Sequence, residues 1–215
     1  MHYGSSTTTS LRLLPDFPTH SHRDMEIITY VVDGALAHAD SMGNGSTIRR
    51  GEVQRMTAGT LVTHSEMNPD AAAPVRFLQI WILPAQRGLS PSYEQATFGE
   101  EEKRNQLRLI ASNDGKAGSI RVHQDIALYA SCLDADRRLE HSLSRDRYGW
   151  IQVVSGQISV NGHALDSGDG LGMMRVSSLN IEAKTPAEFL LFDSRVATDD
   201  PAPSRKTTTR RGQLG

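Results

Sequence analysis

The sequence predicts an all-β protein built from two small β-barrels in tandem. Short runs of β-branched and apolar residues are separated by glycine, asparagine and aspartate, which is typical of strands joined by tight turns. One strand–turn–strand layout also occurs twice, at residues 28–36 and 151–160, and each copy is followed by a second glycine turn, at residues 50–52 and 166–170. This repetition predicts two copies of one barrel, fused head to tail.

The same turn residues also delimit the individual strands. Strands are expected at residues 26–32, 75–83, 150–154, 157–160 and 189–192, with turns at 33–34, 43–45, 155–156 and 161–162. Helical periodicity is weak, and residues 99–109 predict one short helix or a charged connector, inside a wider connecting segment at 84–118. The predicted domains are a variable N-terminal segment (1–18), a first barrel (19–110), a second barrel (111–195) and a disordered tail (196–215).

Composition restricts the function classes. The chain has 215 residues with a net charge of −2, which disfavours nucleic-acid binding through a basic surface. Cys132 is the only cysteine, so an intrachain disulfide is excluded and a reducing compartment is expected. No window reaches about 18 consecutive apolar residues, and the start of the chain lacks the apolar core of a signal peptide. The sequence therefore predicts a cytoplasmic protein without a membrane partner.

Two pairs of chemically active residues stand at the ends of extended segments. His20 and His22 are separated by one residue, and so are His64 and Glu66. Alternate residues of a strand share a face, so each pair presents both side chains to one space. Three imidazoles and one carboxylate suit a divalent metal, Fe(II) first, with Ni, Cu, Mn, Co or Zn as alternatives. The competing interpretation is that these are polar side chains hydrogen-bonded at strand ends, and two such pairs weigh against it.

A longer, ordered set of motifs accompanies these residues. The motifs lie at residues 20–34, 38–45, 51–59, 64–66, 79–81, 91–95, 122–125 and 150–156. In this order they resemble the pirin family of the cupin superfamily, and in particular the bacterial pirin-like proteins described as quercetin 2,3-dioxygenases. The resemblance extends over residues 19–193.

The resemblance implies a bicupin whose N-terminal barrel holds one metal ion through three histidines and one glutamate. Position by position, these ligands are His20, His22, His64 and Glu66, the same four that strand parity indicates. The second barrel has no histidine at residues 177–182 and is expected to lack a metal site. Pirin-like proteins have several dozen residues ahead of the His-x-His segment. Here nineteen precede His20, so we expect an incomplete N-terminal barrel.

Other titratable residues near the motifs are assigned different roles. Other cupins use a glutamate of the first motif as a ligand, but pirin-like proteins take their carboxylate from the second motif. We therefore leave Glu26 outside the metal shell, to form hydrogen bonds or to pair with Arg23. His38 and His123 are assigned structural roles, or at most support of the ligands.

The activity that the resemblance implies is cleavage of a flavonol such as quercetin by O2, with release of CO. Glu66 would be the catalytic base that removes the proton of the flavonol 3-hydroxyl, while His20, His22 and His64 would remain fixed ligands. A small aromatic or enol substrate needs an apolar lining, for which we consider six residues that are nearby in sequence: Met25, Ile27, Met42, Met56, Leu61 and Val62.

Two alternatives remain open. One is a non-catalytic, iron-binding transcription cofactor or redox sensor that acts on a protein partner, as eukaryotic pirins are described, and the basic cluster in the C-terminal tail favours it. The other is a degenerate cupin that binds a small molecule without turnover. Metal-dependent capture of a partner without oxygen consumption would indicate the first, and failure to retain metal would indicate the second.

Overall fold

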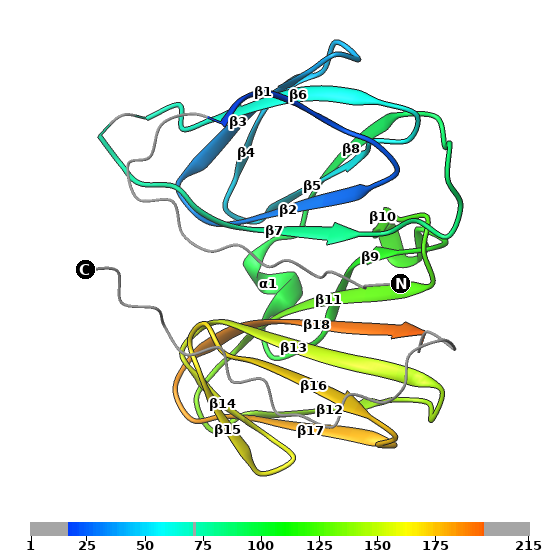
Figure 1. The fold of residues 1–215 in the computed structure, drawn as a ribbon. Helices are drawn as coiled ribbons and strands as arrows, with labels where there is room; N and C mark the ends of the chain where they lie inside the picture. Colours follow the sequence, from blue (N-terminus) through cyan, green and yellow to red (C-terminus); the bar gives the residue numbers. More distant parts are fainter. Residues whose placement is uncertain (1–16, 71, 196–215) are drawn as a thin grey trace, which may run out of the picture. The chain divides into compact units, whose positions relative to one another are not determined.

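The computed structural model describes residues 17–70 and 72–195, and strands make up most of them (Figure 1). The chain divides into two compact units. The first unit comprises the described residues up to Gly99 together with Ile110–Asp125. The second unit comprises Glu100–Leu109 and the described residues from Ile126 onward. The predicted all-β class is confirmed.

Two four-stranded antiparallel sheets form most of the first unit. Their orders are β1-β6-β3-β4 and β7-β2-β5-β8. The strands are β1 (Phe17–His22), β2 (Glu26–Asp33), β3 (Ala35–Asp40), β4 (Gly45–Arg49), β5 (Glu52–Thr57), β6 (Val62–Met67), β7 (Arg76–Ile82) and β8 (Ser92–Thr97). A short parallel pair, β9 (Arg108–Ser112) and β10 (Ile120–Arg121), follows.

The second unit contains one helical turn and eight strands among its described residues. These are α1 (Glu100–Lys103), β11 (Ile126–Leu133), β12 (Arg138–Ser142), β13 (Arg147–Ser155), β14 (Gln157–Val160), β15 (His163–Asp166), β16 (Gly170–Met174), β17 (Ser178–Ala183) and β18 (Ala187–Arg195). One sheet has the order β12-β17-β14-β15, and β11-β18-β13-β16 follow one another in another sheet.

The two units repeat one pattern of seven strands, because β1–β7 correspond in order to β12–β18. The order β1-β6-β3-β4 matches β12-β17-β14-β15, and β7-β2-β5 matches β18-β13-β16. The matching turns contain Gly34 at φ +74° and Gly156 at φ +77°. A Cβ atom at either glycine would collide with the carbonyl oxygen of Pro74 or Pro186. The predicted tandem repeat is confirmed, and each copy is a jelly-roll-like pair of sheets rather than a closed barrel.

Each unit has its own apolar core. The second unit has one large cluster, which includes Ile151, Leu179, Ile181 and Leu191. The apolar clusters of the first unit are smaller, and they include one around Val31, Leu36, Ile48, Val75 and Phe77 and one around Ile27, Met56 and Val62. On β2 the buried Thr29 stands between Ile27 and Val31, on the same face. A polar side chain therefore interrupts the core of the first unit, whereas the corresponding cluster of the second unit is continuous.

The predicted strands at 26–32, 75–83, 150–154, 157–160 and 189–192 correspond to β2, β7, β13, β14 and β18. Only the four residues of α1 become helical within 99–109, and the expected connecting segment also contains β8 and β9. Residues 1–16 of the predicted variable segment and the predicted disordered tail lie outside the described residues, whereas Phe17 and Pro18 already belong to β1. Among the described helices, none has the length and apolar composition to cross a membrane.

Candidate metal centre

Neighbouring strands of one sheet bring the candidate ligands together. β6 carries His64 and Glu66 and lies between β1, which carries His20 and His22, and β3. In the antiparallel register His20 is opposite His64, and His22 is opposite Val62. Residues that are opposite one another share a face, and Val62 belongs to the apolar core of the first unit. The histidines therefore point into this unit.

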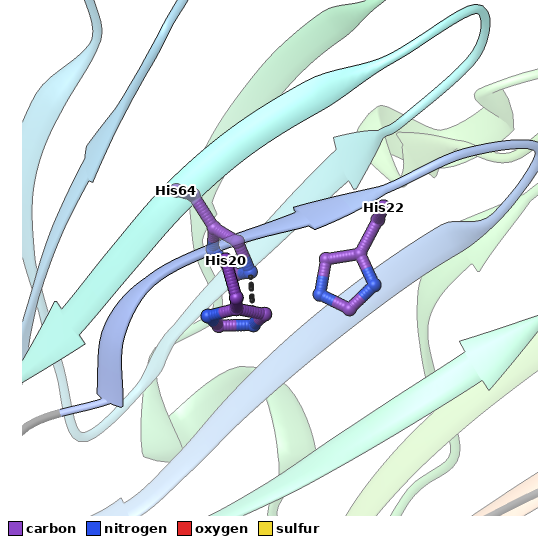
Figure 2. Close-up of side chains that lie close together, drawn as sticks. All are labelled: His20, His22 and His64. Atoms are coloured by element: carbon purple, nitrogen blue, oxygen red, sulfur yellow. Dashed lines mark hydrogen bonds between the residues drawn. The ribbon is translucent and has the colours of Figure 1, made fainter.

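The three imidazoles converge at short distances (Figure 2). The ring centroids of His20 and His64 are 4.4 Å apart, those of His20 and His22 4.8 Å, and those of His22 and His64 5.0 Å. The Nε2 atoms of His20 and His64 are separated by 3.0 Å. Two nitrogens bound at about 2.1 Å to one metal ion, roughly at a right angle, would have about this separation. His20 Nδ1 donates to the Pro18 carbonyl oxygen at 2.9 Å, so its Nε2 keeps a lone pair.

The surroundings keep two of these imidazoles neutral. The pKa of His64 is lowered to about 3, mainly by burial and then by the neighbouring imidazoles of His20, His22 and His38, while Asp40 acts in the opposite direction. Burial, followed by the nearby His20, also lowers the pKa of His22. A neutral imidazole is the form that binds a metal ion. Both rings are therefore in the ligand form at neutral pH.

Glu66 follows His64 by two residues on β6 and is opposite His38 of β3. It is buried, and burial raises its pKa to about 7, although the hydrogen bond from Gln79 and the proximity of His20 act in the opposite direction. A carboxylate oxygen of Glu66 groups with His64 and His38, whereas His64 also groups with His20 and His22. Within each group the ligand atoms lie within 4.8 Å of one another. His64 therefore links Glu66 to the other two predicted ligands.

Unpartnered polar atoms mark the same place. His22 Nε2 and Glu66 Oε1 are shielded from solvent, and neither has a hydrogen-bond partner among the described residues. Buried polar atoms without partners are costly, so they indicate a missing ligand. Imidazole nitrogens with one carboxylate oxygen are a donor set for a divalent transition metal. The residues present fit such an ion.

His38 is close to this site but both of its nitrogens are engaged. Gln54 Nε2, which can only donate, contacts His38 Nδ1 at 3.2 Å, so His38 carries its proton on Nε2 and donates it to Asp40 Oδ2, also at 3.2 Å. This is the supporting role expected of His38. Asp40 and Gln54 were not identified from the sequence, and the only local signal was that Asp40 shares strand parity with His38 on β3.

An apolar wall adjoins the histidines. Ile27, Met56 and Val62 are buried together, and Met25, Met42 and Trp81 pack against them. The Trp81 ring meets His22 edge-on at a centroid distance of 4.9 Å. Five of the six residues expected to line the site therefore belong to this wall. Leu61 is not part of this cluster: it is 50% exposed and precedes β6 with the parity opposite to that of Val62.

Glu26 lies away from the candidate ligands. It is buried on β2, on the face opposite Ile27, and its Oε2 is 3.4 Å from His123 Nδ1. The expected hydrogen-bonding role is present, but the partner is His123 rather than Arg23. Because His123 is 97 residues from Glu26 along the chain, no local pattern could have indicated this pair.

The matching positions of the second unit have a different composition. Where the first unit has His20, His22, His64 and Glu66, the strand registers place His141, Leu143, Leu179 and Ile181. Leu179 and Ile181 are part of the apolar core. The remaining histidine, His141, contacts the carboxylate of Asp193 at 2.9 Å.

Comparisons with known proteins agree with this architecture. Residues 1–82 match the pirin family, and residues 109–194 match the quercetinase C-terminal cupin domain. Quercetin 2,3-dioxygenase of Escherichia coli (strain K12) is 42% identical over 177 residues, which are 82% of this chain and 75% of that protein. The crystal structure of YhhW from Escherichia coli has a TM-score of 0.84 and 38% identity, and the match covers 90% of this chain and 83% of that chain. The crystal structure of the bacterial pirin YhhW in complex with nickel(II) has a TM-score of 0.80 and 40% identity, covering 85% and 77%. The chain therefore belongs to the pirin family of the cupin superfamily.

Proposed function

We propose that this protein is a metal-dependent dioxygenase of the pirin type that cleaves a flavonol such as quercetin with O2 and releases CO. The observation that carries the proposal is the convergence of His20, His22 and His64 beside Glu66, whose Oε1 is buried without a partner among the described residues. The 42% identity to a quercetin 2,3-dioxygenase supports the reaction class and the substrate.

His20, His22, His64 and Glu66 would hold the ion. When bound, the metal supplies a Lewis acid that lowers the pKa of the flavonol 3-hydroxyl. Glu66 is suited to accept that proton, because its Oε1 has no other partner in the described structure. Glu66 belongs to a group with His64 and His38 and is not part of the group formed by His20, His22 and His64. The three histidines can therefore keep their arrangement while Glu66 acts as the base.

The apolar wall would bind the aromatic rings of the substrate. Met25, Met42 and Trp81 are partly buried, so they retain surface on which a flat ring can pack. A flavonol on this wall would lie against side chains that exclude water from the reacting carbons. We also propose Fe(II) as the resident ion, with nickel as the first alternative because a relative is seen in complex with it. A reducing cytoplasm suits the single Cys132.

The test compares bound metal per chain in the wild type and in two variants. His64→Ala should lose the metal, whereas His141→Ala, which changes the histidine at the matching place in the second unit, should retain it. Adding quercetin to the metal-loaded wild type should then cause oxygen uptake and release of CO.

Three outcomes would contradict the proposal. Metal that is retained in His64→Ala would refute the ligand set. Metal binding without oxygen uptake would refute the activity and favour the cofactor or redox-sensor hypothesis. Absence of metal from the wild type, even after reconstitution, would favour the degenerate cupin.

A further inference from the structure

We propose that Gln79, held in one orientation by Trp81, is a positioning residue that determines which oxygen of Glu66 faces the metal. The inference rests on the proposed function only in taking Glu66 as a metal ligand. It concerns β7, which contributes no ligand of its own.

A chain of two hydrogen bonds connects Trp81 to Glu66. Trp81 Nε1 donates to Gln79 Oε1 at 3.0 Å, and Gln79 Nε2 donates to Glu66 Oε2 at 2.9 Å. An indole N–H can only donate, so the amide oxygen of Gln79 must face Trp81 and its NH₂ group must face Glu66. Rotating the amide by half a turn would break both bonds. The donor role of Trp81 Nε1 and the acceptor role of the Glu66 carboxylate therefore fix the orientation of the Gln79 amide.

This fixed amide distinguishes the two oxygens of Glu66. Oε2 is occupied by Gln79, whereas Oε1 is buried and has no hydrogen-bond partner among the described residues. Oε1 is consequently the oxygen left for a metal ion or for a substrate proton. Without Gln79 the carboxylate could rotate, and either oxygen could take either place.

Trp81 is itself held against the site. Gln79 and Trp81 are alternate residues of β7 and share its inner face. The Trp81 ring packs on the apolar wall and meets His22 edge-on. Trp81 thus contacts one proposed ligand directly and acts on another through Gln79.

The second unit provides an independent comparison. The registers place Gln79 and Gln54 on either side of Thr29, forming a polar row across β7, β2 and β5. At the matching positions the second unit has Leu191, Ile151 and Leu171, all of which lie in or against its apolar core. The fold therefore does not require the polar row. In the second unit Ile181 stands at the position of Glu66, and Leu191 stands at the position of Gln79. The carboxylate and the amide are therefore absent together, which associates Gln79 with Glu66.

The experiment uses three variants of the full chain. Gln79→Leu introduces the side chain found at the matching position of the second unit. Trp81→Phe keeps an aromatic ring beside His22 but removes the N–H donor. Gln95→Leu is the matched control, because Gln95 extends the row onto β8, opposite Gln54, and accepts a hydrogen bond from Tyr93.

Two measurements are independent of turnover: the Ni(II) affinity, from competition with a chelator, and the visible absorption spectrum of the Co(II)-loaded protein. Gln79→Leu should weaken Ni(II) binding by about 10- to 100-fold and change the Co(II) spectrum, as loss of a group that orients a ligand does. Trp81→Phe should change both in the same direction by a smaller factor, and Gln95→Leu should match the wild type. With quercetin, Gln79→Leu should lower kcat more than it changes KM.

Wild-type Ni(II) affinity together with an unchanged Co(II) spectrum in Gln79→Leu would overturn the inference. If that variant does not fold, the same two results in Trp81→Phe would overturn it. An equal loss of affinity in Gln95→Leu would also overturn it, since loss of any glutamine of the polar row would then have the same effect. If the wild type takes up no oxygen with quercetin, the proposed function fails, and the Ni(II) and Co(II) measurements still decide the role of Gln79.

Discussion

Replacement of Thr29 by valine should stabilise the protein. Thr29 is 0% exposed at the centre of the polar row, and its Oγ1 has no hydrogen-bond partner among the described residues. A hydroxyl buried in this way costs about 1–3 kcal/mol. Valine has nearly the same shape, and Ile151 shows that the matching position accepts an apolar side chain. We expect the free energy of unfolding to rise by about 1–2 kcal/mol, which corresponds to an increase in Tm of about 2–8 °C.

The assay is thermal and urea unfolding of the metal-free protein, followed by circular dichroism. Thr57→Val is the matched control, because Thr57 is also 0% exposed but its Oγ1 accepts a hydrogen bond from Arg55 Nη1 at 2.6 Å. Loss of that charge-assisted bond should lower stability by about 1.5–3 kcal/mol. The two substitutions should therefore act with opposite signs. A loss of stability in Thr29→Val as large as in Thr57→Val would refute the reasoning, since the Thr29 hydroxyl would then be hydrogen-bonded in solution.

Three further predictions concern other parts of the molecule. Burial raises the pKa of Asp193, but hydrogen bonds from His141 and Arg147 outweigh it and hold the pKa below its ordinary value. The ionised Asp193 therefore stabilises the folded protein above a pH of about 4, and this stabilisation is lost as the pH falls through the lower pKa of the folded state. Asp193→Asn should lower the free energy of unfolding by about 3 kcal/mol at pH 7, and by progressively less in thermal melts at acidic pH. Gly34→Ala should lower stability in urea by more than about 1 kcal/mol, because φ is positive and the new Cβ has no space; wild-type stability would contradict this. Free Ni(II) at about 100 times its Kd should stabilise the wild type by about 2.7 kcal/mol in thermal melts and leave His64→Ala unchanged; equal shifts would point to binding elsewhere.

The sequence predicts much of the architecture because the deciding signals are local. Turn residues such as Gly34 and Gly156 mark equivalent corners of the two copies, and both have the positive φ that favours glycine. Strand parity correctly places His20 and His22 in one space, because two residues of one short strand need no tertiary information to share a face.

The parts that sequence reasoning missed depend on register between distant strands. Thr29, Gln54 and Gln79 become neighbours only because β2 pairs with β5 on one side and with β7 on the other. Thr29 and Gln79 each have apolar neighbours in their strands, whereas Gln54 is one of several polar residues of β5. Neither pattern by itself distinguishes a site from an exposed strand face. The pair Glu26 and His123 has the same origin, since its members lie 97 residues apart.

The location of two proposed ligands on β1 has a kinetic consequence. β1 stands at the end of the order β1-β6-β3-β4, and within the described structure it pairs with β6 alone. Edge strands open locally at lower free energy than strands inside a sheet. Fraying of β1 would carry His20 and His22 away from His64 in one motion, while the rest of the unit stays folded. Exchange of the ion would then follow the opening of this six-residue strand, and a bound ion would in turn crosslink the strand to the sheet and slow hydrogen exchange along it.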